Sequence, residues 1–321
     1  MLVNLIILVV LIALVLGLGY LTYRAIRAQR MWVKIIGGFF GGVATLLIAA
    51  IAGLGLAGML SYYPTINPPV PVANDWKVES TPEQLARGQY IVSFSCAGCH
   101  SQKGDFQPPL IGGSDFAKEI PMPIGSIVAS NIASDGQIKD YTDAQLFCAI
   151  RHGVRSDGSK LTFMSNLAIR EFSDDDTKAV IAYLRAQPPA NNPSKGGDSL
   201  NYLATMLFGA GMFPPYAPGQ QTIAALPQGE TPDYGKYVAT LGDCRGCHGS
   251  NMTGMPEGPT GPGAPNPRPF VATLSLDQFK QMMRTGVRPN GTPLEMPWQV
   301  ASKMTDSDLA AVYAYLKAEV K

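Results

Sequence analysis

Charge, cysteine and histidine are all scarce in this sequence, and each scarcity narrows what the protein can be. Charged residues make up 15% of the 321 residues and the formal net charge is +1. No basic excess therefore exists to neutralise phosphates, and nucleic acid is not expected as a partner. The five cysteines are an odd number; four stand in two Cys-x-x-Cys-His segments and Cys148 is left over. That arrangement does not suit a disulfide framework.

Two long N-terminal stretches, 1–23 and 35–62, contain no charged residue at all. Each is longer than the roughly 20 apolar residues that span about 30 Å of hydrocarbon. We therefore predict a transmembrane hairpin over residues 1–62, with helices at about 2–23 and 35–62. A cleaved signal peptide is the alternative for the first stretch. It would need positive charge ahead of its apolar run, and Met1 to Asn4 supply none.

The loop predicted at 24–34 is basic, with Arg24, Arg27, Arg30 and Lys34 and no acidic residue. Because basic loops favour the cytoplasmic side of a membrane, we expect this loop inside and everything after Tyr62 on the outer side. The second helix is rich in glycine, which lets helices approach closely in lipid. These glycines fit packing within the hairpin or docking onto membrane subunits of a larger complex; they are Gly37, Gly38, Gly41, Gly42, Gly53, Gly55 and Gly58.

A proline-rich stretch at 63–79 follows the hairpin, and beyond it the sequence repeats. The prolines favour an extended spacer. The two copies of the repeat predict two domains, at 80–189 and 231–321, joined by an interdomain linker at 190–230.

Matching segments define the repeat. Gly88-Gln-Tyr-Ile, ahead of the first Cys-x-x-Cys-His segment, matches Gly235-Lys-Tyr-Val ahead of the second. Further on, Arg151-His-Gly-Val matches Arg284-Thr-Gly-Val. Each copy closes with a helix that carries an apolar stripe, and the expected N-caps of these helices are Ser173 and Thr305. We therefore predict an all-α protein whose two outer domains share one plan.

The two Cys-x-x-Cys-His segments consist of Cys96, Cys99 and His100, and of Cys244, Cys247 and His248. One helical turn presents both thiols of such a segment to the two vinyl groups of a haem, and the adjacent His ligates the iron. The pattern therefore predicts two covalently bound haem c groups. A thioredoxin-like thiol pair would be expected near a βαβ pattern, which is absent. A four-thiolate zinc site would want its pairs roughly 15–20 residues apart, and these pairs lie in different halves of the chain.

The sixth iron ligand follows from a shortage of histidine. Only three histidines exist, and two are already used, so methionine is the expected second ligand in at least one site. Met164 and Met296 precede the two closing helices by equal spacing, and we predict both as ligands. For the first site the alternative is a packing Met164 with His152 as ligand. The repeat disfavours this alternative, since Thr285 replaces His152 in the second copy.

Cys148 lies in a segment expected to be helical, from Asp143 to Arg151, beside Leu146 and Phe147. We interpret it as a small buried apolar residue. A reactive thiol is the alternative, although no second free cysteine exists to resolve its oxidised form.

Both outer domains resemble class I cytochromes c. Three segments of the first domain resemble the first domain of multihaem cytochrome subunits of periplasmic dehydrogenases. They are Asn131-Ile-Ala-Ser-Asp-Gly-Gln-Ile, Tyr141-Thr-Asp-Ala-Gln-Leu and Arg151-His-Gly-Val. Cys247-His-Gly-Ser-Asn-Met-Thr-Gly and Glu295-Met-Pro-Trp-Gln resemble their later domains. Those subunits usually carry three haems and a C-terminal membrane helix. This sequence has two haem segments and an N-terminal hairpin, and Ser165 follows Met164 where the family tends to have proline.

The resemblance implies one-electron transfer by two haems with His and Met ligands, on the outer face of the inner membrane. Expected partners are the membrane, membrane subunits of an electron-transport complex or dehydrogenase, and a soluble cytochrome, copper protein or oxidase. The chain itself is then not an enzyme. The competing hypothesis is a dihaem redox enzyme, of the peroxidase or thiosulfate dehydrogenase type, which requires an open or unusual coordination position.

Overall fold

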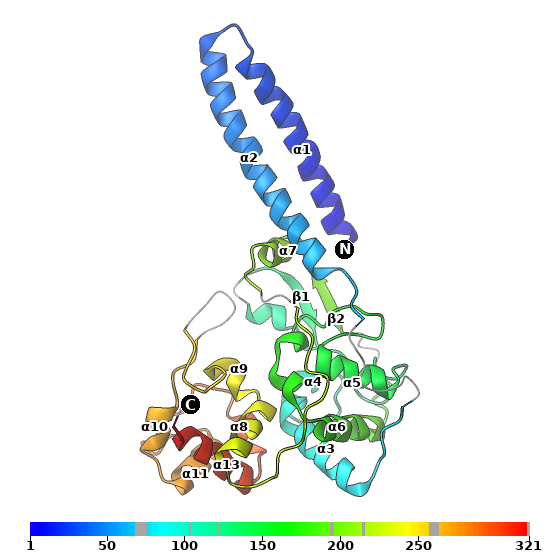
Figure 1. Ribbon diagram of the computed structural model, residues 1–321, viewed down its shortest axis with the longest axis vertical. Coiled ribbons are helices and arrows are strands. Elements are labelled where there is room, and N and C mark those ends of the chain that lie inside the picture. The colour runs from blue at the N-terminus through cyan, green and yellow to red at the C-terminus, as the bar shows by residue number, and fades with distance from the viewer. Residues whose placement is uncertain are drawn as a thin grey trace. The chain divides into compact units, whose positions relative to one another are not determined.

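The structure, a computed structural model, describes residues 1–67, 76–102, 104–120, 122–192, 196–213, 216–256 and 263–319. Residues 68–75 of the predicted proline-rich spacer at 63–79 lie outside these residues. The all-α prediction is confirmed, because almost all regular structure is helical (Figure 1). Two four-residue strands, β1 Gly125–Val128 and β2 Gly197–Leu200, pair into one small sheet.

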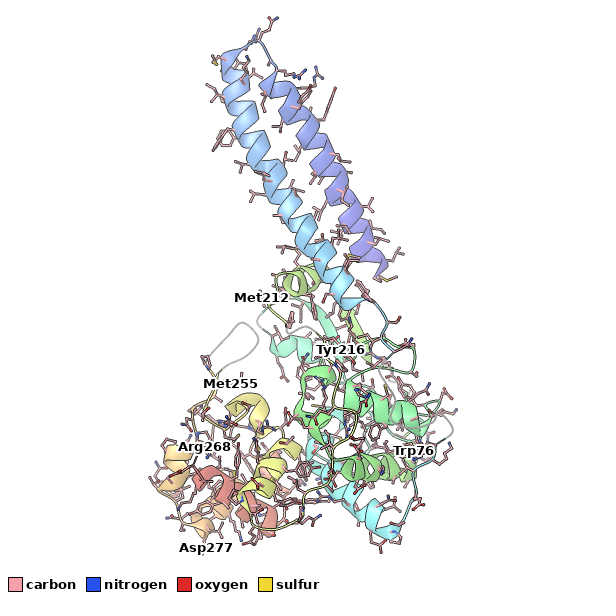
Figure 2. All side chains as sticks on the ribbon, viewed as in Figure 1. Trp76, Met212, Tyr216, Met255, Arg268 and Asp277 are labelled. Carbon is pink, nitrogen blue, oxygen red and sulfur yellow. The ribbon has the colours of Figure 1, made fainter. Side chains whose placement is uncertain are left out.

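The chain forms two compact units. The first comprises Met1–Thr65, Ala117–Ser126 and Ser199–Tyr216. Its main part is a hairpin of α1 Leu2–Ile26 and α2 Met31–Tyr62, both long and apolar enough to cross a membrane. Many large apolar side chains of both helices are exposed, and they radiate from the hairpin in Figure 2.

The two long helices extend further into the basic segment than the sequence suggested. We predicted helices at about 2–23 and 35–62, whereas only 27–30 separate α1 from α2. Arg and Lys are good helix formers, and their long side chains reach polar surroundings from a helix end. The connection between the helices is therefore tight.

The hairpin glycines make close contacts of two kinds. A Cβ added to Gly37 would lie 2.7 Å from Cβ of Ala25, and one on Gly41 would lie 2.5 Å from Oγ1 of Thr22. These glycines therefore serve packing of α1 on α2. Gly58 faces a different element, since its Cβ would lie 1.6 Å from the carbonyl oxygen of Thr205.

Thr205 belongs to α7 Tyr202–Gly209, a helix inside the segment that we predicted as an interdomain linker. The approach is mutual, because a Cβ on Gly209 would lie 2.0 Å from the carbonyl oxygen of Leu54. The buried Asn4 side chain adds a polar tie, donating to Tyr63 Oη and to the Leu200 carbonyl at 2.9 Å each. Part of the predicted linker is thus folded onto the hairpin.

The second unit holds two helical domains. The first domain contains α3 Pro82–Ser95, α4 Ala97–His100, α5 Asp143–His152 and α6 Asp174–Ala186, with 3₁₀ turns η1 Phe116–Glu119, η2 Met164–Asn166 and η3 Ala168–Glu171. The second contains α8 Pro232–Leu241, α9 Cys244–His248, α10 Arg268–Ala272, α11 Leu276–Thr285, α12 Gln299–Ser302 and α13 Asp306–Lys317. One apolar core runs through both domains.

The repeated glycine marks the same helix crossing in each domain. In the first, α3 crosses α6 at Gly88, where a Cβ would lie 2.0 Å from the carbonyl oxygen of Ala179. In the second, α8 crosses α13 at Gly235, where a Cβ would lie 1.9 Å from the carbonyl oxygen of Ala311. Only glycine allows backbone to meet backbone this closely. Each Cys-x-x-Cys-His segment follows directly at the end of α3 or α8, the helix that makes this crossing.

The predicted N-caps of the closing helices are confirmed. Ser173 Oγ accepts from the backbone N–H of Asp176 at 3.1 Å, and Thr305 Oγ1 accepts from that of Asp308 at 3.1 Å. These bonds satisfy backbone donors that a helix start leaves without an intrahelical acceptor.

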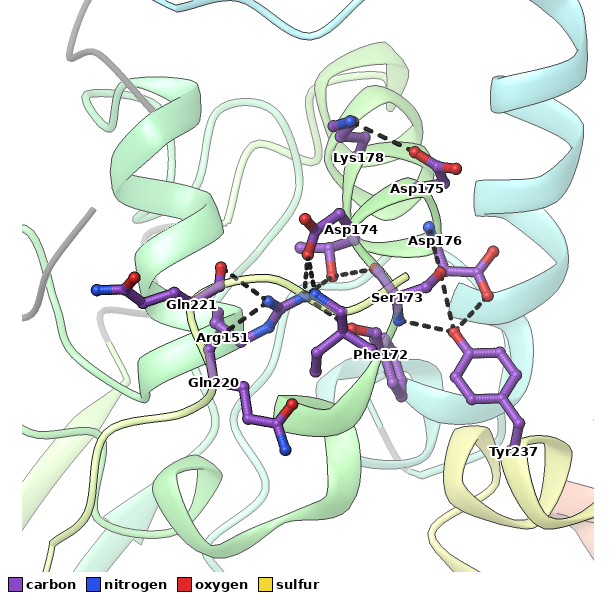
Figure 3. A network of polar contacts seen from close by, with 12 residues as sticks. Arg151, Phe172, Ser173, Asp174, Asp175, Asp176, Lys178, Gln220, Gln221 and Tyr237 are labelled. Atoms are coloured by element: carbon purple, nitrogen blue, oxygen red, sulfur yellow. Dashed lines mark hydrogen bonds and ion pairs between the residues drawn. The ribbon is translucent and has the colours of Figure 1, made fainter. Parts of the chain in front are cut away.

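The repeated arginine holds the start of the same helix. Arg151 is fully buried and its Nη2 donates to the Phe172 carbonyl at 2.7 Å and to Asp174 Oδ1 at 2.9 Å (Figure 3). Its Nη1 donates to the carbonyls of Gln220 and Gln221, which fastens the chain between the domains to the first domain. In the second copy, Arg284 Nη2 likewise donates to Asp306 at 2.7 Å.

Candidate functional site

The first Cys-x-x-Cys-His segment lines an apolar cavity. Cys96 ends α3, and α4 follows at once, so that Cys96, Cys99 and His100 lie within one helical turn. All three line the cavity, and Met164, at the start of η2, lines it too. Apolar side chains form most of the remaining wall, among them Ile132, Ile138, Leu146, Ile150, Leu167 and Leu184. Four predicted site residues from distant parts of the sequence are therefore brought together.

The imidazole of His100 is held in the form that a metal requires. Its Nδ1 lies 2.8 Å from the carbonyl oxygen of Ser130. Because a carbonyl can only accept, Nδ1 carries the proton and Nε2 keeps its lone pair. Burial also lowers the pKa of His100, although the Ser130 contact opposes this, so the ring stays neutral. A ligand His that donates its second nitrogen to a carbonyl is the usual arrangement at protein metal sites.

His248 repeats this arrangement in the second domain. Its Nδ1 lies 2.9 Å from the carbonyl oxygen of Pro265, which assigns the same tautomer by the same reasoning. Both proposed proximal ligands thus have a backbone carbonyl behind the ring, although the two carbonyls belong to unrelated residue types.

The cysteines do not have the character of redox-active thiol pairs. Burial raises the pKa of the Cys96 thiol to about 12 and that of Cys244 to about 12. Reactive Cys-x-x-Cys pairs instead depress the pKa of their nucleophilic thiol. Within the described part of the chain, no three His, Cys, Asp or Glu side chains gather as a metal-binding group.

Met164 and His152, the two candidates for the second ligand of the first site, differ in where they lie. Met164 lines the cavity, whereas the fully buried His152 at the end of α5 is not part of its lining. The placement favours Met164. Cys148, also on α5, is buried and does not line the cavity either, as expected for a packing residue. Burial raises the pKa of its thiol to about 11.

The second site has the same elements with more exposure. Cys244 and Cys247 lie at the ends of one turn in α9, with Cys247 exposed and His248 half-buried, whereas His100 in the first domain is buried. Met296 is half-buried in the segment between α11 and α12. A site with this exposure lets more water reach whatever it holds.

A polar group at the first cavity was missed by sequence reasoning. Thr162 Oγ1 donates to Asp198 Oδ2 at 2.5 Å, and Arg155 Nη2 lies 3.5 Å from the same oxygen; all three line the cavity. The sequence repeat could have identified Arg155, because Arg288 occupies the matching position in the second copy. Arg155 donates to the Lys160 carbonyl at 2.7 Å and its counterpart Arg288 to the Pro293 carbonyl at 2.5 Å, each across the same turn.

The first cavity fits a haem c on its own features. It offers two neighbouring thiols, a neutral imidazole with a defined tautomer, a thioether sulfur and an apolar wall. These are the groups that attach haem c, ligate its iron and shield it from water. The second domain offers two thiols and an imidazole of the same tautomer on a more exposed helical turn.

Each of the two domains matches a known protein family. Residues 83–184 match the family described as cytochrome c oxidase, cbb3-type, subunit III. Residues 232–318 match the family described as cytochrome c.

Similar curated proteins are cytochrome subunits. The chain is 32% identical over 178 residues to the gluconate 2-dehydrogenase cytochrome c subunit of Pantoea cypripedii, covering 51% of this chain and 37% of that protein. It is 28% identical over 258 residues to the fructose dehydrogenase cytochrome subunit of Gluconobacter japonicus, covering 73% and 52%. It is 32% identical over 175 residues to the cytochrome c subunit of the quinone alcohol dehydrogenase of Gluconacetobacter polyoxogenes, covering 51% and 35%. These matches span between a third and about half of each relative.

Proposed function

We propose that this chain, which has a cbb3-type cytochrome domain at 83–184 and a cytochrome c domain at 232–318, carries two haem c groups and transfers single electrons on the outer face of a membrane. The observation that carries this proposal is the first cavity, where Cys96, Cys99, His100 and Met164 meet within an apolar wall. A bound haem supplies an iron that alternates between the ferrous and ferric states.

The residues of each site have separate tasks in this proposal. Cys96 and Cys99, and likewise Cys244 and Cys247, fix the group covalently. His100 and His248 present Nε2 to the iron, while the carbonyls of Ser130 and Pro265 hold the imidazoles in place. Met164 and Met296 would supply the second protein ligand of each iron, which would leave no position for oxygen or peroxide and favours electron relay over catalysis.

The hairpin supports a role as a membrane anchor. α1 and α2 are long and apolar enough to span the bilayer, and we propose that both do, with their basic connection on the cytoplasmic side. The chain then sits in the inner membrane with both haem domains outside. The cytochrome subunits that it resembles belong to gluconate, fructose and alcohol dehydrogenases by name. We propose the catalytic subunit of such a dehydrogenase as electron donor, and a soluble cytochrome, a copper protein or an oxidase as acceptor.

Cysteine variants of the full chain test the haem assignment. We expect two haems per chain by alkaline pyridine spectroscopy, and one haem after replacing either Cys96 and Cys99 or Cys244 and Cys247 by Ala. Cys148→Ala is the matched control and should keep both, since Cys148 does not line the cavity. A wild-type protein with fewer than two covalent haems would refute the proposal.

Spectroscopy of the wild-type protein distinguishes relay from the enzyme alternative. A near-infrared band typical of His/Met coordination at both sites is expected for an electron-transfer protein. A high-spin haem at either site would instead favour a peroxidase or thiosulfate dehydrogenase, because such an enzyme needs an open or displaceable ligand.

A further inference from the structure

Two tyrosines at matching positions of the repeat cross between the cytochrome domains. Tyr90 on α3 of the first domain donates to Asp308 Oδ2 at 2.5 Å and accepts from the backbone N–H of Thr305 at 2.9 Å. Asp308 and Thr305 lie at the start of α13, the closing helix of the second domain. Tyr90 therefore caps a helix that belongs to the other domain.

Tyr237 on α8 makes the reverse connection. Its hydroxyl donates to Asp176 Oδ2 at 2.6 Å and accepts from the backbone N–H of Ser173 at 2.8 Å (Figure 3). Asp176 and Ser173 begin α6, the closing helix of the first domain. Each tyrosine stands two residues after the repeated glycine, Gly88 or Gly235, so the two connections are equivalent.

The two tyrosine contacts have the geometry of a two-fold interface, formed here between two domains of one chain. In such an interface residue i contacts residue j and the counterpart of j contacts the counterpart of i. A sliding or rotation of one domain against the other would therefore break both tyrosine contacts together. Burial is the main cause that raises the pKa of Tyr90 and of Tyr237, with the facing carboxylates adding to it, so both hydroxyls keep the proton that they donate.

The same interface carries both attachment segments. Ser95, the residue before Cys96, donates from Oγ to the carbonyl of Leu241, the last residue of α8. Beyond it, Asp243 Oδ1 accepts from the backbone N–H of Ala168 at 3.3 Å, and Arg245 Nη1 lies 2.6 Å from Glu171 Oε2. The segments that would bind the two haems thus approach each other where the tyrosines fasten the domains.

We propose that Tyr90 and Tyr237 are positioning residues that lock the two cytochrome domains into one pseudo-two-fold pair, with the two attachment segments at a fixed separation. The contacts that form this lock belong to the chain itself. Its use rests on the proposed function: a single electron passes directly from one site to the other, the first being oxidised as the second is reduced. No proton or atom needs to cross the interface.

The two halves of the lock are not equally strong. Arg87 on α3 donates to both carboxylate oxygens of Asp176, at 2.7 and 2.8 Å. The matching position in the second copy is Tyr234. This pair lies within the first domain and does not span the interface, but after Tyr237→Phe it keeps the buried Asp176 carboxylate hydrogen-bonded, which lowers the cost of losing the tyrosine. Tyr90→Phe should therefore loosen the pair more than Tyr237→Phe.

Distance measurements on the full chain in lipid nanodiscs test the lock. Spin labels are introduced as noncanonical residues at Glu83 in the first domain and Asp277 in the second, both exposed (Figure 2 labels Asp277). Double electron–electron resonance should give one narrow distance distribution for the parent. The distribution should broaden in Tyr90→Phe and broaden further in Tyr90→Phe/Tyr237→Phe.

Tyr313→Phe is the matched control, because the Tyr313 hydroxyl donates to the Leu274 carbonyl at 2.6 Å within the second domain. It should leave the distribution unchanged. A double variant that keeps the narrow parental distribution would overturn the proposal, and so would an equally broad distribution in the control. If the double variant does not fold, the two single variants test the proposal. A broader distance distribution in Tyr90→Phe than in Tyr237→Phe supports it, and parental distributions in both would overturn it. Haem content is measured on the same samples, so a failure of the haem assignment is recognised separately from a failure of the lock.

Discussion

The helix crossing at Gly88 allows a quantitative prediction. In Gly88→Ala the new Cβ would lie 2.0 Å from the carbonyl oxygen of Ala179 and 2.8 Å from Cβ of Tyr183. Favourable contact between such atoms begins at roughly 3.5 Å, so α3 and α6 would have to separate by roughly 1.5 Å. The obstacle is backbone, which cannot rotate aside as a side chain could.

The expected loss follows from two opposing effects. Overpacking of a core costs about 1–3 kcal/mol, and a clash with backbone belongs at about the upper end of that range. Alanine is a better helix former than glycine by about 1 kcal/mol, which offsets part of the loss. The net destabilisation is then about 2 kcal/mol, or a fall of about 4–8 °C in Tm for a unit of this size. Gly235→Ala should behave alike, because its Cβ would lie 1.9 Å from the Ala311 carbonyl oxygen.

Thermal unfolding of the full chain in detergent, followed by circular dichroism, measures this effect. The matched control is Gln89→Ala, which places the same residue one position along α3 on an exposed face. It should change stability by less than about 0.5 kcal/mol. If Gly88→Ala unfolds at the same temperature as Gln89→Ala, α3 and α6 do not cross as closely as the structure indicates.

Three further predictions use other contacts. Met164→Ala should abolish the near-infrared band of the first site while His152→Ala retains it, and the opposite result would make His152 the ligand. Denaturant titration should show Arg151→Ala losing about 3 kcal/mol, because the fully buried guanidinium is lost together with its bonds to the Phe172 carbonyl and the half-buried Asp174. Arg284→Ala, whose pair is more exposed, should lose about 1 kcal/mol; equal losses would contradict this. Since the folded-state pKa of Tyr90 and Tyr237 lies above the usual value of about 10, the interface should be intact below about pH 10 and weaken as the pH rises above it. Unfolding titrations at increasing pH should show a larger loss in the parent than in Tyr90→Phe/Tyr237→Phe, where Tyr234, whose pKa burial also raises, still contributes.

Local patterns in the sequence were enough for much of the fold. Uninterrupted apolar runs predicted α1 and α2, and the Ser173 and Thr305 caps were readable because an N-cap bonds to residues only three positions away. The Cys-x-x-Cys-His segments were recognisable for the same reason, since their chemistry fits in one turn. The ligand assignments themselves stay predictions.

Features that depend on distant backbone could not be read in advance. The carbonyls of Ser130 and Pro265 orient the two imidazoles, and a backbone carbonyl leaves no mark in the residue type. The docking of α7 on α2 needs Gly58 and Gly209 to meet across a long sequence separation. The repeat did show Gly-x-Tyr twice, but the contact of each tyrosine with the other copy appears only in three dimensions.

If α1 and α2 anchor the chain in a membrane, as proposed, the assignment of α7 to the hairpin has a consequence for how the rest of the chain can be detached. Residues 117–126 and 199–216 belong to the same compact unit as α1 and α2, so the polypeptide returns to that unit twice after first leaving it at Thr65. A protease cut in the stretch between Thr65 and Trp76 would sever the chain but not release a soluble fragment. Release of the two cytochrome domains would then require cleavage at several places at once.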